Sequence, residues 1–341
     1  MVCLCFEDSG MSTPQTREVA MTSDCCQLKM QGVAEMLLLT SDVRPVKSDN
    51  LVMFGSSFSD CRDVILAQTE GLHAILSSLT RQLYDVTTRW QDISKLIQDM
   101  CLVVVQLMEC CSHSAYLLAS SQEEFEPAQK GIVDKYEIAC AKLDLEITCV
   151  KLRTAQVEDL TPQVLIDNCT DISKHLTKLT ECCRVASEMA TDPFTQDQFK
   201  LCIKSATACA GVLVASIKAF KQRPSESLHY RCSFFCDPLL ASVNALVKFS
   251  TELEFTGLPA MISQGVKEVQ EVVLGTCMNI TSSCIQLCKA IKQLAYDNTN
   301  EVSRSKIPAC MESVSRACQQ LTTVLIQCHV HKNGKGETKG R

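Results

Sequence analysis

Hydrophobic residues recur every three or four positions along most of this chain, from about residue 23 to residue 331. Residues three and four apart share one face of a helix, so this spacing predicts one amphipathic helix after another, about nine in all. The clearest is 262–296, where polar Gln270, Asn279, Gln286 and Lys292 lie between the regularly spaced apolar positions. A helix of this length would extend for about 50 Å at 1.5 Å per residue.

The other helices are expected at about 23–41, 57–86, 91–119, 132–154, 161–190, 193–222, 225–253 and 302–330. Thr161 and Asp192 each precede a proline, which predicts a capping side chain ahead of a proline in the first helical turn. Pro238 and Pro308 lie inside helical patterns and are expected to kink or restart their helices. Asp237 is the expected cap of the restart at Pro238.

Only two stretches interrupt the pattern in the manner of loops, at 120–131 and 256–261, and they isolate a block of four helices. An even number of antiparallel helices starts and finishes at the same end of its bundle, so this block can be inserted into another bundle. The sequence therefore predicts an all-α, nine-helix unit with a four-helix bundle inserted into a five-helix bundle. The alternative is a contiguous five-then-four division near 153–163 or 189–195, where the connections are shorter and less loop-like.

These breaks give the expected boundaries. Residues 1–22 are expected to be disordered, and 23–125 to supply the first three helices of the five-helix bundle. Residues 130–257 should form the inserted bundle, and 258–331 should supply the last two helices. The tail, 332–341, is basic and rich in glycine, which is typical of a solvated, disordered end.

The composition fits this picture, with 46% hydrophobic and 21% charged residues among 341 and few glycines or prolines. The 23 cysteines raise the possibility of a disulfide scaffold. However, no signal peptide is apparent at the start, and many cysteines occupy apolar helical positions, where a reduced thiol behaves as a small hydrophobe. A reducing, cytoplasmic location is expected. The longest dense apolar run, 101–105, is far too short to cross a bilayer, so no membrane span is expected.

No pattern in the sequence indicates an active site. Phosphate-binding and dinucleotide-binding loops are absent, and the six histidines form no metalloprotease pair. We therefore expect no enzyme, no cofactor and no metal. A net charge of −6 gives no argument for nucleic acid.

Charge is distributed unevenly within the four-helix block. Residues 200–250 hold seven basic residues against two acidic ones, whereas 131–199 hold seven against twelve. A concentration of positive charge on two successive helices suits an acidic partner surface such as a filament. The alternative is a solvated face paired with the neighbouring acidic helices. The basic residues are Lys200, Lys204, Lys218, Lys221, Arg223, Arg231 and Lys248.

Phe234 and Phe235 form a second feature of interest. Adjacent residues on a helix point about 100° apart, so one narrow core stripe cannot easily accommodate both rings. An exposed ring beside Pro238 would be a candidate association site. The alternative is that both rings are buried around the proline.

Four segments resemble talin rod modules: CCQLKMQGVAEMLLLTSDVRPV (25–46), SFSDCRDVILAQTEGL (57–72), DQFKLCIKSATACAGVLVASIK (197–218) and RCSFFCDPLLASVNALVKF (231–249). The resemblance extends over nearly all of 25–296 and weakly over the last helix. It implies a nine-helix unit similar to the adjacent seventh and eighth talin rod modules. It also implies filamentous actin as a partner, homodimers formed through the four-helix module, and binding of LD-type peptide helices.

The resemblance favours the basic set as an actin-facing surface and the region of Phe235 as a dimer contact. The function expected is that of an actin-bundling homodimer of the cytoskeleton, present in filament bundles and filopodia. The alternative is an adhesion adaptor that binds LD-type peptides without bundling actin.

Overall fold

The computed structural model describes residues 13–46, 57–85, 89–122, 125–297 and 300–336. Over these ranges the chain forms ten α-helices and one short 3-10 helix, and it contains no β-strand. A lone antiparallel bridge joins Glu126 and Met261. The predicted all-α fold is confirmed.

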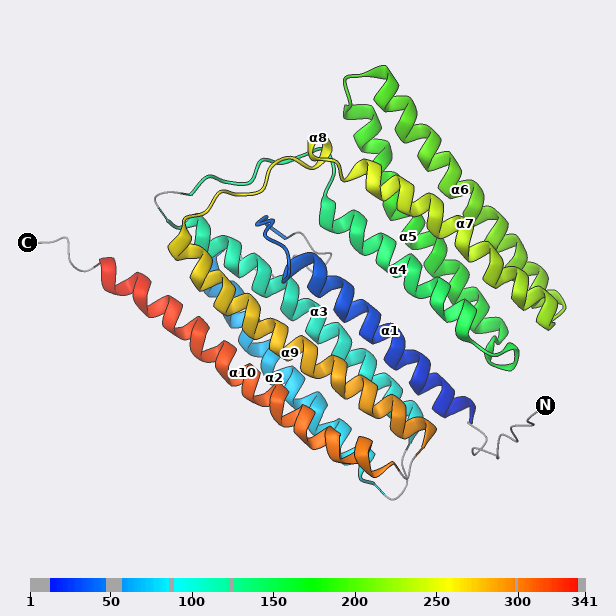
Figure 1. Ribbon diagram of the computed structural model, residues 1–341, viewed down its shortest axis with the longest axis horizontal. Helices are drawn as coiled ribbons and strands as arrows, with labels where there is room; N and C mark the ends of the chain where they lie inside the picture. Colours follow the sequence, from blue (N-terminus) through cyan, green and yellow to red (C-terminus); the bar gives the residue numbers. More distant parts are fainter. Residues whose placement is uncertain (1–12, 47–56, 86–88, 123–124, 298–299, 337–341) are drawn as a thin grey trace, which may run out of the picture.

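Five helices form the first bundle (Figure 1): α1 (Pro14–Leu37), α2 (Phe58–Leu83), α3 (Trp90–Ser120), α9 (Gln264–Tyr296) and α10 (Glu301–Gly336). Their buried side chains belong to one hydrophobic cluster. Helix α3 packs against α1, α2 and α9, so it occupies a central place in this bundle. Its Ile93, Ile97 and Val104 are completely buried.

Four helices form the second bundle: α4 (Lys135–Thr154), α5 (Pro162–Met189), α6 (Pro193–Gln222) and α7 (Glu226–Ser250). They pack as a ring in which α4 contacts α5, α5 contacts α6, α6 contacts α7 and α7 contacts α4. Phe199 lies fully buried in the second core, with ring centroids 4.7 Å from Phe249 and 5.1 Å from Phe255. A 3-10 turn (Val157–Asp159) joins α4 to α5, and α8 (Leu253–Thr256) follows α7.

The second bundle is inserted into the first, as predicted. Helices α9 and α10 follow it in the chain yet share a core with α1, α2 and α3. Figure 1 shows the two connecting segments running side by side between the bundles. The contiguous five-then-four division is therefore wrong for the described helices.

The two connecting segments are paired through their backbones. Glu126 and Met261 exchange both N–H···O bonds, at 3.2 and 3.0 Å, and the Gln129 N–H donates to Leu258 O at 2.9 Å. Gly257 has a φ of +68°, and a Cβ there would collide with the Gln129 carbonyl oxygen. Glycine is needed at this crossing because it tolerates positive φ and adds no side chain.

The first helix begins earlier than predicted. Residues 14–22 were assigned to a disordered segment, but α1 starts at Pro14, and residues 1–12 lie outside the described part. The Thr13 hydroxyl accepts from the Thr16 N–H at 3.3 Å, and proline suits the first turn because its missing N–H has no helical partner there. The first turn of α1 is polar, so the helical spacing of apolar residues is recognisable only from Val19, which is buried.

Neither interior proline restarts its helix, because α7 continues through Pro238 and α10 through Pro308. Proline removes one helical hydrogen bond, and water can satisfy the freed carbonyl where the helix surface is exposed. Both prolines lie on exposed positions. Asp237 pairs with Arg153 of α4 instead of capping a restart. Helix α10 extends to Gly336, so the prediction of a disordered tail from residue 332 is wrong over 332–336.

The bundles meet along α1 and α4, which run antiparallel. Arg17 pairs with Asp159 at 2.7 Å and Lys29 with Asp144 at 2.6 Å. Between these pairs and the connecting segments, α4 approaches α1 closely at Gly32, where a Cβ would lie 2.7 Å from the side chain of Leu143. Polar contacts therefore surround a small apolar contact, and the two bundles are held in a defined register.

Candidate protein-interaction site

The four-helix bundle presents an unusually apolar outer surface on α6. This helix is anchored at its start by Asp192, whose carboxylate accepts from the Thr195 N–H at 2.8 Å. Its core face carries Phe199, Leu213 and Phe220, all completely buried. On the opposite side, spacings of seven, eleven and eighteen residues align a row of exposed apolar residues along the helix. These are Phe194, Leu201, Ala208, Val212, Ala215 and Ala219.

Helix α7, which packs against α6, adds exposed aromatic side chains of its own. Tyr230 and Phe234 are exposed by 71% and 54%, whereas Phe235 is only partly buried against the core. The rings of Phe234 and Phe235 meet edge to face, with centroids 5.3 Å apart. The sequence left open whether both rings are buried. The structure shows that they are not, because Phe234 lies on the surface. Phe234 is the more accessible of the two, whereas the resemblance favours the region of Phe235.

Three helices of this protein are unusually apolar, and they differ in how much of their apolar surface is buried. Helices α3, α6 and α7 are each long and apolar enough to cross a membrane by length and composition alone. The most apolar stretch of α3 is 61% buried inside the protein, but those of α6 and α7 are only 22% and 28% buried. Alanine and cysteine raise the mean hydropathy of these helices without forming long unbroken apolar runs. The exposed apolar surface therefore belongs to α6 and α7.

The seven predicted basic residues all lie exposed on this pair of helices or on the turn between them. Lys200, Lys204, Lys218 and Lys221 follow one flank of α6, because their spacings of four, fourteen and three residues keep them within a sector of about 100°. Arg223 lies at the turn, and Arg231 and Lys248 lie on α7. The structure thus divides the set into a row on α6 and three separate positions.

Most of this positive charge is not neutralised by neighbours. Among the described residues, Lys200 is the member of the set with an ion-pair partner, Asp197, at 3.0 Å on its own helix. The acidic residues of α4 and α5 instead pair with other cations, such as Lys142 with Glu146 and Lys178 with Glu137. The basic flank therefore stays available to a partner.

A groove between α5 and α6 lies beside the basic flank. It has a volume of about 760 Å³, and its apolar lining includes Leu165, Ile166 and Val214. Lys174 of α5 joins Lys218 and Lys221 of α6 around it. The sequence does not single out Lys174, because α5 carries more acidic than basic residues. Only the packing of α5 against α6 brings Lys174 to the edge of this groove.

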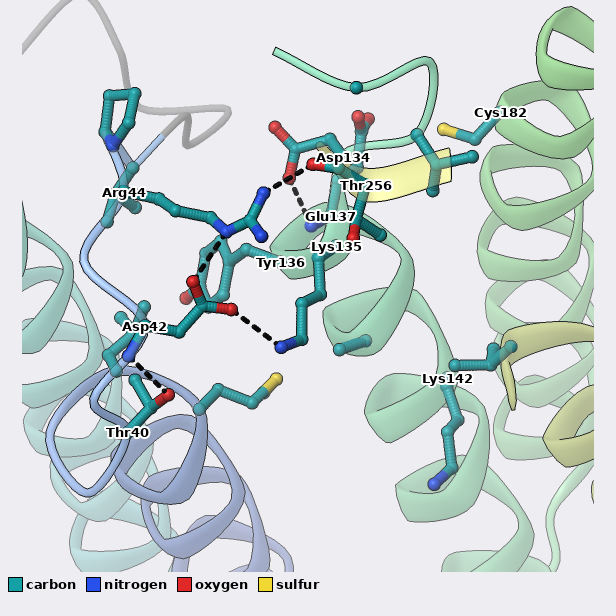
Figure 2. A pocket seen from close by; sticks show the side chains of 18 of the residues that line it. Thr40, Asp42, Arg44, Asp134, Lys135, Tyr136, Glu137, Lys142, Cys182 and Thr256 are labelled. Carbon is teal, nitrogen blue, oxygen red and sulfur yellow. Dashed lines mark hydrogen bonds and ion pairs between the residues drawn. The ribbon is translucent and has the colours of Figure 1, made fainter. Parts of the chain in front are cut away.

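A second pocket, of about 820 Å³, opens at the junction of the two bundles (Figure 2). Asp42 accepts from Arg44 and from Lys135 of α4, each at 2.8 Å. Arg44 also donates to the carbonyl oxygens of Thr256 and Gly257 in the connecting segment. Burial acts to raise the pKa of Asp42, but the bonds from Lys135 and Arg44 outweigh it and leave that pKa below its usual value.

One more contact closes the junction below this pocket. The Tyr136 hydroxyl of α4 donates to the Glu109 carboxylate of α3 at 2.7 Å, and Glu109 is only 6% exposed. Burial, followed by the neighbouring thiol of Cys140 and the Glu109 carboxylate, raises the pKa of Tyr136 well above its ordinary value. Tyr136 therefore remains a hydrogen-bond donor and ties the four-helix bundle to the central helix of the other.

The cysteines of the described ranges are free thiols, and Cys3 and Cys5 lie outside those ranges. Burial raises the pKa of Cys183 to about 11 and that of Cys288 well above its ordinary value, so these thiols remain protonated. Within the described part, no three His, Cys, Asp or Glu side chains are grouped to hold a metal ion.

This chain is similar to known talins. The family model of the talin IBS2B domain matches residues 109–252, which include the whole inserted bundle. Talin of Oscarella pearsei is 25% identical over 297 residues, covering 87% of this chain and 11% of that protein. Talin-2 of Mus musculus is 26% identical over 217 residues (64% and 9%), and Talin-1 of Gallus gallus is 23% identical over 267 residues (78% and 10%).

The fold defines an all-α protein in which one helical bundle is inserted into another. The comparisons show that this chain is similar to talins over most of its length and to the talin IBS2B domain over the inserted bundle. The chain spans about a tenth of the length of these relatives.

Proposed function

We propose that this protein is a cytoskeletal adaptor that binds and bundles actin filaments as a homodimer joined through its four-helix bundle. The observation that carries the proposal is the exposed apolar surface of α6 and α7 with a basic flank beside it. A two-fold dimer that covers the apolar surface would display two equivalent basic flanks. Two such flanks allow one dimer to contact two filaments.

The apolar surface supports self-association because its α6 part lies on the side of the bundle away from the five-helix bundle. Helix α6 contacts α5 and α7 but not α4 or the first bundle among the main packing contacts. Aromatic residues such as Tyr230 and Phe234 are enriched at the energetic centres of interfaces. An exposed apolar patch of this kind is typical of a surface that another molecule covers.

The basic flank supports actin binding through charge. Actin filaments are acidic, and exposed lysines attract an acidic surface over a distance of about one Debye length, roughly 8–10 Å at moderate salt. Affinity should therefore fall as salt is added. The expected location is the cytoplasm, on actin bundles and in filopodia, which fluorescent tagging in cells would test.

The central test is Phe234→Asp, with Phe235→Asp beside it. A charge at the exposed Phe234 should give a folded monomer that still pellets with actin at high speed but no longer forms bundles that pellet at low speed. Leu102→Asp is the matched control, because Leu102 is a comparably exposed apolar residue (55%) on the five-helix bundle. Light scattering that finds Phe234→Asp still dimeric contradicts the assignment of the dimer surface, and a wild-type protein that does not pellet with actin contradicts actin binding.

A second candidate function is favoured by the groove between α5 and α6. An acidic amphipathic peptide helix of the LD type could place its apolar stripe on Leu165 and Val214 and its carboxylates near Lys174 and Lys218. Titration of such a peptide into the full chain distinguishes the two functions. Saturable binding that Lys174→Glu abolishes, in a protein that leaves actin unbundled, would favour the adaptor without bundling.

A further inference from the structure

The pocket at the junction of the two bundles differs from the groove between α5 and α6 in the charge around it. Its floor is α4, and its walls come from α1 on one side and α5 on the other. Helices α1 and α5 both pack on α4 but have no main packing contact with each other, so they leave a valley above α4. The five-helix bundle supplies one wall and the four-helix bundle supplies the other.

The floor and walls of this valley are apolar. Met36 of α1, Leu143 of α4 and Val185 of α5 all line it. Met36 and Leu143 are only partly buried, and Val185 is 38% exposed. With a volume of about 820 Å³, the pocket is at the upper end of the range of about 300–1,000 Å³ usual for ligand sites, which often lie between domains.

Six carboxylates and four basic side chains line the valley, so acidic residues are in excess. Glu35 of α1 and Glu181 of α5 stand on the two opposite walls, and both are exposed. Glu146 lies on α4 between them, paired with Lys142 at 3.4 Å. At the closed end, Arg44 and Lys135 both form ion pairs with Asp42. Glu181 pairs with Arg184 on its own helix at 2.6 Å, and Glu35 accepts from Gln31 at 3.0 Å. Both carboxylates are exposed, so a cation of a ligand can also reach them.

We propose that this valley binds a basic amphipathic peptide helix of a partner protein, which would contact both bundles at once. The apolar stripe of the peptide would lie on Met36, Leu143 and Val185, and its lysines or arginines would reach Glu35 and Glu181. The proposal depends neither on actin binding nor on dimerisation. It gives the protein two grooves of opposite character, one for acidic helices and one for basic helices.

The probe is a fluorescein-labelled synthetic helix of about 18 residues, with leucines at i, i+3, i+4 and i+7 and lysines on both flanks. Its partner probe has every lysine replaced by glutamate. Fluorescence anisotropy with the full chain should show saturable binding of the lysine peptide that weakens with added salt. Glu35→Lys combined with Glu181→Lys should weaken this binding about threefold to tenfold, since two exposed ion pairs are lost.

The matched control is Glu271→Lys combined with Glu312→Lys, which makes the same change in net charge on exposed positions of α9 and α10. Glu312 pairs with Arg316 on its own helix just as Glu181 pairs with Arg184, so the local disturbance is similar. This control should leave the affinity within about twofold of the wild type. Equal weakening by both double variants would overturn the proposal, because it would assign the attraction to net charge alone.

A steric variant tests the location without altering charge. Ala139→Trp adds a large side chain to the floor on α4 and should reduce binding of the lysine peptide at least about tenfold. Circular dichroism and light scattering establish that each variant remains folded. Unchanged binding by a folded Ala139→Trp, or tighter binding of the glutamate peptide that the same variant abolishes, would overturn the proposal.

Discussion

Helices α3 and α6 have similar apolar composition and opposite surroundings. Helix α3 packs against three neighbours in the five-helix bundle, and its most apolar stretch is 61% buried. Helix α6 packs mainly against α5 and α7, and only 22% of its most apolar stretch is buried. Composition alone therefore does not tell a core helix from a helix with an exposed apolar face, and the number of packing partners decides between them.

The difference follows from the architecture. A fifth helix allows α3 to be surrounded, whereas each helix of a four-helix ring keeps an outward face. In α4 that face is covered by α1, but α6 lies across the ring from α4. An apolar outward face so placed gains no stability for the single chain, because its burial requires another molecule.

The largest effect is expected inside the second core. Phe199→Ala removes a completely buried ring that contacts the rings of Phe249 and Phe255, so it should lower the free energy of unfolding by about 3–5 kcal/mol. Phe194→Ala, on the outer face of the same helix, is the control and should change it by less than about 0.5 kcal/mol. Urea denaturation measures both. A similar loss for Phe194→Ala would mean that the outer face is structural after all.

A smaller effect is expected at the contact that joins the bundles. Tyr136→Phe keeps the ring but removes the hydroxyl that donates to the nearly buried Glu109 carboxylate, which should cost about 1–3 kcal/mol. Tyr296→Phe serves as the control because Tyr296 is 56% exposed. Urea denaturation compares the two, and an equal effect of both changes would show that the Tyr136 bond does not stabilise the junction.

Acidification should destabilise both bundles, because each contains one partly buried histidine with a lowered pKa. Burial lowers the pKa of His113 on α3 and of His175 on α5, and the nearby Asp144 only partly offsets the effect at His175. The unfolded chain therefore binds protons first as the pH falls below about 6.5, and stability decreases through that range until the folded histidines also titrate.

His113 should respond for a further reason. The Val46 N–H donates to Nδ1 of His113 at 3.3 Å, so protonation of this nitrogen removes a hydrogen bond. His113→Gln and His175→Gln should each flatten the fall in melting temperature between pH 7 and pH 5. A pH profile identical to that of the wild type in both variants would assign the acid sensitivity to other groups.

The helical rhythm and the two loop-like breaks were sufficient to predict the fold, including the insertion, because helix count and loop placement determine which ends meet. The caps at Thr161 and Asp192 were predicted for the same local reason and are present at 3.4 and 2.8 Å. The continuity of α7 through Pro238 could not be predicted, since it depends on solvent reaching the carbonyl that proline leaves without a donor. The start of α1 was missed because its first turn is polar.

The surfaces were only partly predictable. The basic residues are visible in the sequence, and helical spacing places four of them on one flank of α6. The choice between Phe234 and Phe235 depends on the rotation of α7 about its axis, which its neighbours set. Lys174 and the valley above α4 required the packing of several helices, so no local pattern could reveal them. The roles of all these residues in binding remain proposals.

The smallest effect on stability is expected on the basic flank of α6. Lys200→Ala combined with Lys204→Ala should change the free energy of unfolding by less than about 0.5 kcal/mol, because both side chains are exposed and Lys200 loses only a surface pair with Asp197. The same variant should weaken co-sedimentation with actin and reduce its dependence on salt. Glu271→Ala combined with Glu312→Ala controls for exposed charge elsewhere. If the lysine variant lost stability but kept its actin affinity, the flank would be a structural feature of α6, and α6 would resemble α3 in serving the fold alone.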